Sequence, residues 1–346
     1  MKLWKHTVLA LLVVSCLPAC SSREEVKNYD LIIAGCSRTL EANPKDGQAY
    51  RQRGYGYLRK REWDRAIADF NQALELIPPN AKVFNFRGAA YLWKGAMDQA
   101  MADFNRSLDI DPKYAEAYTF RGIAFYQKGD LRRALADYQR ALELNPKDAD
   151  ALFYRGHAHY ENGDQARALA DYNESLRLNP KHREAYNYRG LLYYHQGYWH
   201  WAINDFNRAL GVSPEYAEAY YNRGVAYNRI WDLDRAINDF SRVLEIDPRY
   251  EKAYQIRGLA YYRQRDFDRA LADWNRALEI NPQNSKVYYR KAELLDKYGT
   301  NKEALEAYQS FLKYAPKKAE GYIRQAQDRV KALEIIRENE PGPVAR

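Results

Sequence analysis

Residues 50–78 read YRQRGYGYLRKREWDRAIADFNQALELIP, and the architecture of the chain follows from this segment. Its pattern returns 34 residues later, where Arg87-Gly88 takes the place of Arg53-Gly54. Small and apolar residues fall at i, i+3, i+4, i+7 and i+8 in the first half of each copy, which is the stripe of an amphipathic helix, and a second stripe follows in the second half. Pro78 lacks the N–H that a continuing helix needs. Each copy is therefore predicted to be a pair of helices.

The 34-residue period continues without insertion from residue 47 to residue 318. One pair of helices cannot bury its own apolar face, so the copies must stack on one another. The eight predicted repeats are 47–80, 81–114, 115–148, 149–182, 183–216, 217–250, 251–284 and 285–318.

The order Tyr-x2-Arg-Gly-x2-Tyr from residue 50, followed by Ala66-x3-Phe70 and Pro78, resembles the tetratricopeptide repeat. This resemblance implies an all-α fold, a right-handed α-solenoid of eight helix-turn-helix repeats whose first helices line a concave binding face. Such a stack needs terminal caps with a polar outer face. We expect one capping helix within residues 20–46 and a second over 319–340, followed by a tail at 341–346.

The repeats depart from the usual pattern by carrying an arginine where the family has a leucine. An aspartate follows each arginine after 16 residues, and in the eighth repeat both change together, to Lys291 and Ala307. We interpret these residues as a ladder of partly buried ion pairs, because removing one partner of such a pair leaves an uncompensated charge. The rival interpretation, a ligand-binding or catalytic array, is disfavoured by the sevenfold repetition. The predicted pairs are Arg53 with Asp69, Arg87 with Asp103, Arg121 with Asp137, Arg155 with Asp171, Arg189 with Asp205, Arg223 with Asp239 and Arg257 with Asp273.

The N-terminus is typical of an exported protein. A short basic start precedes an apolar run from Thr7 to Leu17, which is too short to span a bilayer but has the length of a signal-peptide core. The run ends in Leu17-Pro18-Ala19-Cys20, which resembles the lipobox of bacterial lipoproteins. The resemblance implies cleavage of residues 1–19, a lipid on Cys20 and, because no aspartate follows, a place at the outer membrane facing the periplasm. The alternatives are an ordinary secretory signal and an uncleaved anchor.

Aromatic residues recur on the predicted first helices, between the columns that form the core. Tyrosine offers apolar area and a hydroxyl at little entropic cost, which suits a binding surface. The alternative is that tyrosine at these positions is simply what such repeats carry. The predicted partner groove consists of Tyr126, Phe153, Tyr160, Asn187, Tyr194, Tyr221, Tyr262 and Tyr289.

Charge varies along the same face, with an acidic middle and a basic C-terminal end. A groove of this kind would orient a segment of another protein with its acidic groups toward repeats six to eight. The alternative is a merely solvated helix face. The acidic residues are Glu116, Asp150, Glu161, Glu184 and Glu218, and the basic end consists of Arg229, Lys252, Arg263, Lys286 and Lys297.

The cysteine content and the absence of known catalytic motifs argue against an enzyme or a metal site. All three cysteines lie in the first 36 residues, and Cys36 alone would remain unmodified, so neither a disulfide scaffold nor a cysteine zinc site is expected. No nucleophile elbow, phosphate loop or metalloprotease motif occurs. We expect no enzyme, cofactor, metal or small-molecule substrate, and a protein of the cell envelope as partner. The net charge of +8 and the tyrosines leave two alternatives, an RNA-binding repeat protein and a binder of wall glycans.

Overall fold

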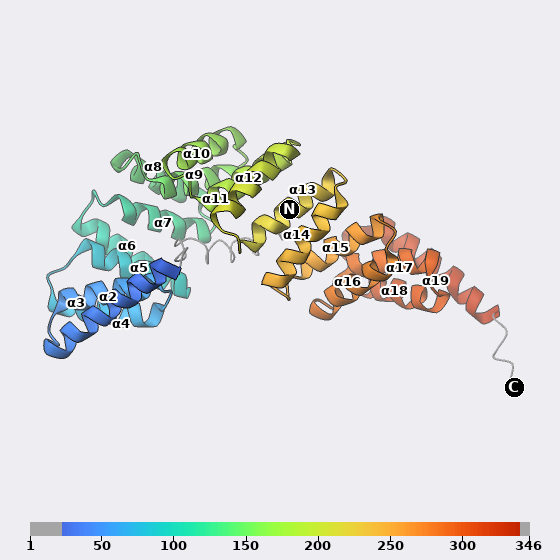
Figure 1. Cartoon of the computed structure of the whole chain (residues 1–346), viewed down its shortest axis with the longest axis horizontal. Coiled ribbons are helices and arrows are strands. Elements are labelled where there is room, and N and C mark those ends of the chain that lie inside the picture. The colour runs from blue at the N-terminus through green and yellow to red at the C-terminus, as the bar shows by residue number, and fades with distance from the viewer. Residues whose placement is uncertain (1–22, 340–346) are drawn as a thin grey trace. The chain divides into compact units, whose positions relative to one another are not determined.

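The computed structural model describes residues 23–339 of the chain (Figure 1). This part contains 18 α-helices, one short 3-10 helix and no strand. The predicted all-α fold of stacked helical pairs is confirmed. The predicted signal peptide, the lipidated Cys20 and the tail at 341–346 lie outside the described residues.

Each repeat consists of two helices, with one helix before the repeats and one after them. The first helices are α3 (Gly47–Arg59), α5 (Ala81–Lys94), α7 (Ala115–Gln127), α9 (Ala149–Glu161), α11 (Arg183–His195), α13 (Ala217–Arg229), α15 (Glu251–Arg263) and α17 (Ser285–Tyr298). The second helices are α4 (Trp63–Leu76), α6 (Met97–Ile110), α8 (Leu131–Leu144), α10 (Gln165–Leu178), α12 (Trp199–Val212), α14 (Leu233–Ile246), α16 (Phe267–Ile280) and α18 (Asn301–Tyr314). The flanking elements are α2 (Arg23–Ala42), the 3-10 helix η2 (Lys317–Ala319) and α19 (Glu320–Asn339).

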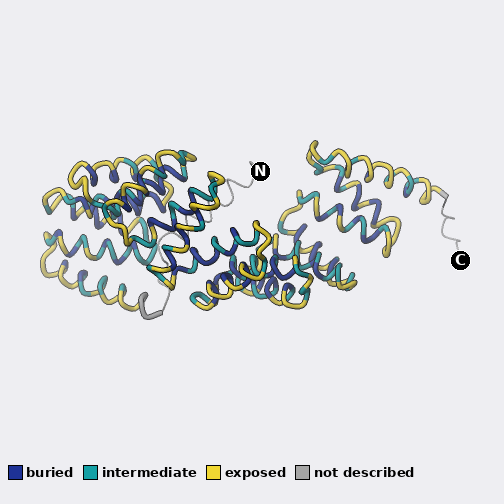
Figure 2. The backbone as a smooth tube through the Cα atoms, turned by 90° about the horizontal axis from the view of Figure 1, so that it is seen from above, coloured by how far each residue is buried: buried dark blue, intermediate teal, exposed yellow. Residues whose placement is uncertain are grey.

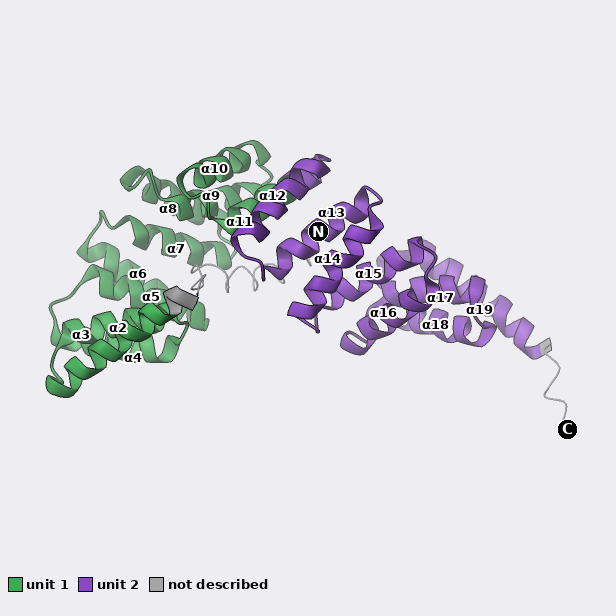
Figure 3. Ribbon diagram, viewed as in Figure 1, with its two compact units in different colours: residues 1–192 green, residues 193–346 purple. Residues whose placement is uncertain are grey.

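The chain divides into two compact units, residues 1–192 and 193–346, and the boundary falls within α11 (Figure 3). In unit 1, α4, α6 and α8 each pack against the first helix of their own repeat and against that of the next repeat. In unit 2, α14 and α16 pack in the same way. The flanking helix α2 packs on α3 of unit 1, and the flanking helix α19 packs on α18 of unit 2. Successive first helices also contact one another, as α5 and α7 do in unit 1 and α13 and α15 do in unit 2.

Glycine and alanine columns set how closely paired helices approach. A methyl group at Gly122 would lie 2.6 Å from Cε1 of Tyr138, and one at Gly88 would lie 2.7 Å from Cε1 of Phe104. The aromatic ring of the second helix therefore rests directly on the backbone of the first, and any larger residue would separate them. The alanine column, such as Ala100, is fully buried in the same seam. Figure 2 shows buried stretches along the helices of the repeats, and exposed ones at the turns and along the last helix before the C-terminus.

The arginines join helices within the repeats. Arg87 of α5 donates two hydrogen bonds, from Nε and Nη2, to the buried carboxylate of Asp103 of α6, at 2.8 and 2.7 Å. Such bidentate bonds to a charged group are strong and geometrically specific. The same pair of bonds joins Arg53 to Asp69, Arg121 to Asp137, Arg155 to Asp171, Arg223 to Asp239 and Arg257 to Asp273. The remaining predicted pair, Arg189 and Asp205, has its members in different units and stays a prediction.

Each arginine also reaches a third helix, a link that the sequence analysis missed. Nη1 of Arg87 donates to Oδ1 of Asn71, in the second helix of the preceding repeat, at 2.7 Å. In the eighth repeat Lys291 keeps only this link, to Asn275 at 2.7 Å. The guanidinium therefore joins the two helices of a repeat and fixes the repeat to its predecessor. The other links are Arg53 to Ser37, Arg121 to Asn105, Arg155 to Gln139, Arg189 to Asn173, Arg223 to Asn207 and Arg257 to Ser241.

Candidate partner-binding groove and C-terminal pocket

The structure divides the eight predicted groove residues into buried and partly exposed ones. Phe153 and Asn187 are each only 2% exposed, and Tyr126 and Tyr289 are also buried. Tyr160, Tyr194, Tyr221 and Tyr262 are half-buried and keep some surface for a partner. In this conformation, Phe153 and Asn187 belong to the interior of the stack rather than to a surface.

Phe153 is buried because its column forms the joint between successive first helices. Its ring lies 4.8 Å from that of His182, the residue just before the next first helix. Tyr221 and Tyr250 occupy the same places two joints later, in unit 2, with ring centroids 5.3 Å apart. Phe153 and Tyr221, which are predicted to line the groove, instead contribute to the joints between repeats.

A second histidine lies in the same aromatic cluster of unit 1. His157 of α9 is buried against Phe153 and Tyr188, and its Nε2 lies 3.0 Å from the hydroxyl of Tyr126. Burial disfavours the imidazolium form and lowers the pKa of His157 to about 4. The His157 side chain is therefore uncharged near neutral pH.

The acidic middle is mostly engaged within the protein. His182 lies between two of the predicted acids, with Nε2 3.3 Å from Oδ1 of Asp150 and Nδ1 3.3 Å from Oε2 of Glu184. Burial alone would lower the pKa of His182, but the two carboxylates outweigh it and raise this pKa to about 9. Glu184 also accepts a hydrogen bond from Arg183 at 2.7 Å, and Glu116 accepts one from the hydroxyl of Tyr114 at 2.5 Å. Glu161 is half-buried, and Glu218 belongs to unit 2, where it accepts from the hydroxyl of Tyr216 at 3.1 Å.

The predicted basic end lies entirely in unit 2. Arg263 donates from Nη1 to both the carbonyl and the side-chain oxygen of Asn228, at 3.1 and 2.7 Å, and its guanidinium lies over the ring of Trp231. Burial and the nearby charges of Arg290 and Arg229 lower the pKa of Arg263. Arg290, which the sequence analysis did not single out, therefore belongs to the same positive region. The other predicted cations, Lys252, Lys286 and Lys297, are exposed.

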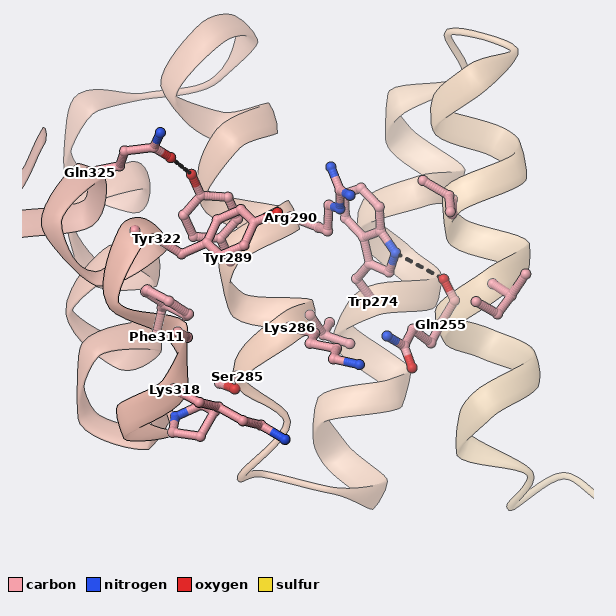
Figure 4. A pocket seen from close by; sticks show the side chains of 16 residues that line it. Gln255, Trp274, Ser285, Lys286, Tyr289, Arg290, Phe311, Lys318, Tyr322 and Gln325 are labelled. Carbon is pink, nitrogen blue, oxygen red and sulfur yellow. Dashed lines mark hydrogen bonds between the residues drawn. The ribbon is translucent and has the colours of Figure 1, made fainter. Parts of the chain in front are cut away.

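A cavity of about 820 Å³ opens at this basic end, between the first helices of the last two repeats and the start of α19 (Figure 4). This volume is within the range of ligand-binding pockets, about 300–1,000 Å³. The pocket is lined by Gln255, Ile256, Leu259, Trp274, Ser285, Lys286, Val287, Tyr289, Arg290, Phe311, Pro316, Lys318, Ala319, Gly321, Tyr322 and Gln325.

The pocket lies at a joint between repeats that has no aromatic pair. The places held by Phe153 and His182, or by Tyr221 and Tyr250, are held in the seventh joint by Gln255 and Asn284. These smaller polar side chains do not fill the space. The helix α17 also packs less extensively on α16 than other first helices pack on the second helix before them within the units. The pocket therefore accompanies the looser packing of α17 on the repeat before it.

The wall of the pocket is held in place by contacts between α17, α18 and α19. The hydroxyl of Tyr289 donates to Oε1 of Gln325 at 2.8 Å, and the Tyr289 ring meets those of Phe311 and Tyr322 edge-on, at 4.9 and 5.0 Å (Figure 4). On the neighbouring side, Nε1 of Trp274 donates to the carbonyl of Gln255 at 3.3 Å. These bonds give the cavity a fixed apolar surface.

The charge of the pocket is positive. Lys286, Arg290 and Lys318 line it, and none of the 16 lining residues is acidic. Arg290 has an ion pair with Glu293 at 3.2 Å. Within the described part of the chain, Lys286 and Lys318 have neither an ion pair nor a hydrogen bond from their side chains. Their charges remain available to a bound group.

Nothing in the described residues indicates a metal centre, since no group of three or more histidine, cysteine, aspartate or glutamate side chains is placed to hold an ion.

Between residues 23 and 339, no helix combines the length and the apolar character that crossing a bilayer requires.

The family models that match the chain all describe the same repeat. Models described as TPR repeat or tetratricopeptide repeat match residues 47–80, 88–129, 122–163, 156–220, 217–250 and 251–284. A search among curated proteins found no match.

Solved structures show the same fold. The APC/C hetero-tetramer Cut9–Hcn1 aligns over 90% of this chain and 60% of its own, with 17% identity and a TM-score of 0.64. The pilF structure from Pseudomonas aeruginosa aligns over 62% of this chain and 97% of its own, with 19% identity and a TM-score of 0.55. A tetratricopeptide repeat protein from Parabacteroides merdae aligns over 73% of this chain and 98% of its own, with 22% identity and a TM-score of 0.51. At these identities the likeness concerns the fold alone. With six matched stretches of repeat and this stacking of helical pairs, the chain belongs to the tetratricopeptide repeat family.

Proposed function

We propose that the protein is a non-enzymatic adaptor, anchored by lipid to the bacterial cell envelope, that binds a segment of a partner protein in the groove of its first helices. The tetratricopeptide repeat fold is a scaffold for protein–protein contacts, and members of the family are typically without catalytic activity. The single observation that carries the proposal is the apolar, positively charged pocket at the end of this groove in unit 2.

The anchor is proposed from the N-terminal sequence. An apolar run followed by Leu17-Pro18-Ala19-Cys20 supports cleavage before Cys20 and lipidation of its thiol. Two acyl chains hold a protein stably, because each buried methylene contributes about 0.8 kcal/mol. We place the protein at the outer membrane, facing the periplasm. There it would gather proteins for envelope assembly, secretion or pilus assembly, or the control of wall enzymes.

The anchor is tested by cell fractionation of the Cys20→Ser variant. We expect the wild type in the membrane fraction and a slower-migrating, unprocessed or released form of the variant. A wild type that stays in the soluble cytosolic fraction with residues 1–19 intact would contradict the proposal.

The binding site is tested by photo-crosslinking in living cells from position 322. The matched control is position 198, because Tyr322 and Tyr198 both lie in unit 2 and are 56% and 57% exposed, but only Tyr322 lines the pocket. We expect an envelope protein to be captured from position 322 and not from position 198. Capture of RNA, or of wall glycan in place of a protein, would support one of the alternatives instead.

A further inference from the structure

We propose that the pocket of the last two repeats binds an extended peptide segment that carries acidic residues beside at least one apolar side chain, and that α19 forms a wall of this site. The inference rests on the proposed function, since it names the chemistry of the partner segment. It also gives α19 a second role in addition to that of a polar cap.

The floor of the pocket favours an apolar side chain. Ile256 and Leu259 of α15, Val287 of α17 and Phe311 of α18 contribute to the lining. Aliphatic and aromatic groups of this kind gain free energy by removing apolar surface from water. A sugar–phosphate backbone could not use such a floor, so a nucleic acid is a poorer occupant than a peptide.

The rim of the pocket favours negative charge. Lys286 and Arg290 of α17 and Lys318 of η2 line the cavity, and no carboxylate does. Complementary charge speeds encounter and sets the orientation of a bound segment, and it disfavours basic segments. Apolar and acidic groups in one short segment therefore match the site better than either alone.

The helix α19 closes one side of the pocket and is fixed in that position. Gly321, Tyr322 and Gln325 of its first turns line the cavity (Figure 4). Further along, Arg329 donates from Nε and Nη2 to Asp296 of α17, at 2.8 and 2.5 Å. A preformed wall of this kind reduces the ordering that binding requires.

The experiment measures binding by fluorescence anisotropy with the full chain in mild detergent. The probe is a fluorescein-labelled Asp-Leu-Phe-Glu-Asp peptide. One comparison peptide, Lys-Leu-Phe-Lys-Lys, reverses the charge, and another, Asp-Gly-Gly-Glu-Asp, removes the apolar side chains. We expect the probe to bind at least about tenfold more tightly than either comparison peptide. Equal affinity for the three peptides, or no binding of the probe, would overturn the proposal.

Two pairs of variants locate the binding. Lys286→Glu with Lys318→Glu reverses the charge of the rim, and we expect about tenfold weaker binding of the probe. Lys302→Glu with Lys331→Glu makes the same change in net charge on exposed lysines that do not line the pocket, and we expect less than a twofold change. An equal loss in both double variants would mean that only overall charge matters, which overturns the proposal.

The contribution of α19 is tested at Tyr322. This side chain is more than half exposed, so its removal leaves the fold intact. We expect Tyr322→Ala to weaken probe binding several-fold and Tyr322→Phe to retain it. An unchanged affinity in Tyr322→Ala would remove α19 from the site.

Other occupants give distinct results. Binding of the probe only after the chain is ended at residue 339 would mean that the protein's own last residues fill the pocket, and tighter binding of a labelled oligouridine would mean an RNA site. Either result overturns the proposal. If the probe does not bind but position 322 still captures an envelope protein in cells, the inference is wrong and the proposed function stands. If the probe binds but nothing is captured, the proposed function fails and the pocket's chemistry stands.

Discussion

The joint between α9 and the start of α11 in unit 1 differs from the joint between α15 and α17 in unit 2, although both are built on the same repeat. In unit 1, aromatic rings close the joint between first helices, and the acids of the predicted groove are held by His182, Arg183 and Tyr114. At the end of unit 2, Gln255 and Asn284 leave the joint open, and two lysines of the rim remain available. The comparison shows that a cavity forms where a first helix packs less closely on the repeat before it.

The largest loss of stability in unit 1 is expected from removing one partner of an arginine–aspartate pair. Asp103→Ala would leave Arg87 uncompensated in the seam between α5 and α6, at a cost of about 3–5 kcal/mol in the free energy of unfolding. The control is Asp98→Ala in the same helix, since Asp98 is 94% exposed and pairs with Lys128 at the surface, where a pair contributes less than about 1 kcal/mol. Urea denaturation of both variants measures the difference, and similar losses would mean that the ladder has no special role.

The next effect concerns pH and the two histidines of unit 1. The folded pKa of His182, about 9, lies above the ordinary value of 6.5, so the stability it contributes is full below pH 6.5 and is lost as the pH rises through 9. We expect the free energy of unfolding to fall by up to about 3 kcal/mol over this window, and His182→Asn to remove most of that change. His157 acts in the opposite sense, because its folded pKa of about 4 makes stability fall as the pH drops from 6.5 to 4.

Urea denaturation at a series of pH values separates the two effects, which are the loss of stability below pH 6.5 (the acid limb) and the loss above pH 6.5 (the alkaline limb). His157→Gln should flatten the acid limb and leave the alkaline limb unchanged. If His182→Asn left the alkaline limb as it is in the wild type, His182 would not carry the charge that holds Asp150 and Glu184 together.

A smaller effect is expected from closing the gap between paired helices. Gly122→Ala would place a methyl group 2.6 Å from the Tyr138 ring, and overpacking of this kind costs about 1–3 kcal/mol. Gly35→Ala in α2 is the control, because nothing lies within 4 Å of the added group, and it should stabilise the helix by about 0.5–1 kcal/mol. Thermal unfolding followed by circular dichroism would show shifts of opposite sign, whereas two shifts of the same sign would argue against the close approach.

The smallest effect on stability is expected from giving the joint between α15 and α17 the aromatic pair found in unit 1. Gln255→Phe with Asn284→His restores the aromatic pair of the fourth joint, and filling the cavity should raise stability by about 1 kcal/mol. The same variant should lose the acidic peptide probe, because the apolar floor is then covered. A variant that keeps full affinity would show that the probe binds elsewhere.

Much of the fold could be predicted from the sequence because the repeat fixes it. The 34-residue period and the 16-residue separation of Arg87 and Asp103 place these residues on facing helices in every copy. The link from Arg87 to Asn71 was missed, although a signal was present: a polar residue stands two positions after each aspartate of the ladder. It was overlooked because its partner lies in the next repeat, and only the stacking shows which atoms meet.

The binding site was less predictable, for a physical reason. A column that faces solvent and a column that forms the joint between repeats have the same period, so the spacing does not reveal that Phe153 is buried. The pocket depends on residues that do not repeat, chiefly those of η2 and α19, and on the looser packing of α17 on α16. Tertiary packing decides where such residues lie, and no spacing rule encodes it.

The most direct measurement of this difference is hydrogen–deuterium exchange of the whole protein with and without the acidic peptide probe. We predict that added protection is confined to segments from α15 to α19, and that α7 to α10 of unit 1 exchange as before. Protection centred on unit 1, with none between α15 and α19, would contradict the claim that the open joint of the last two repeats is the binding site.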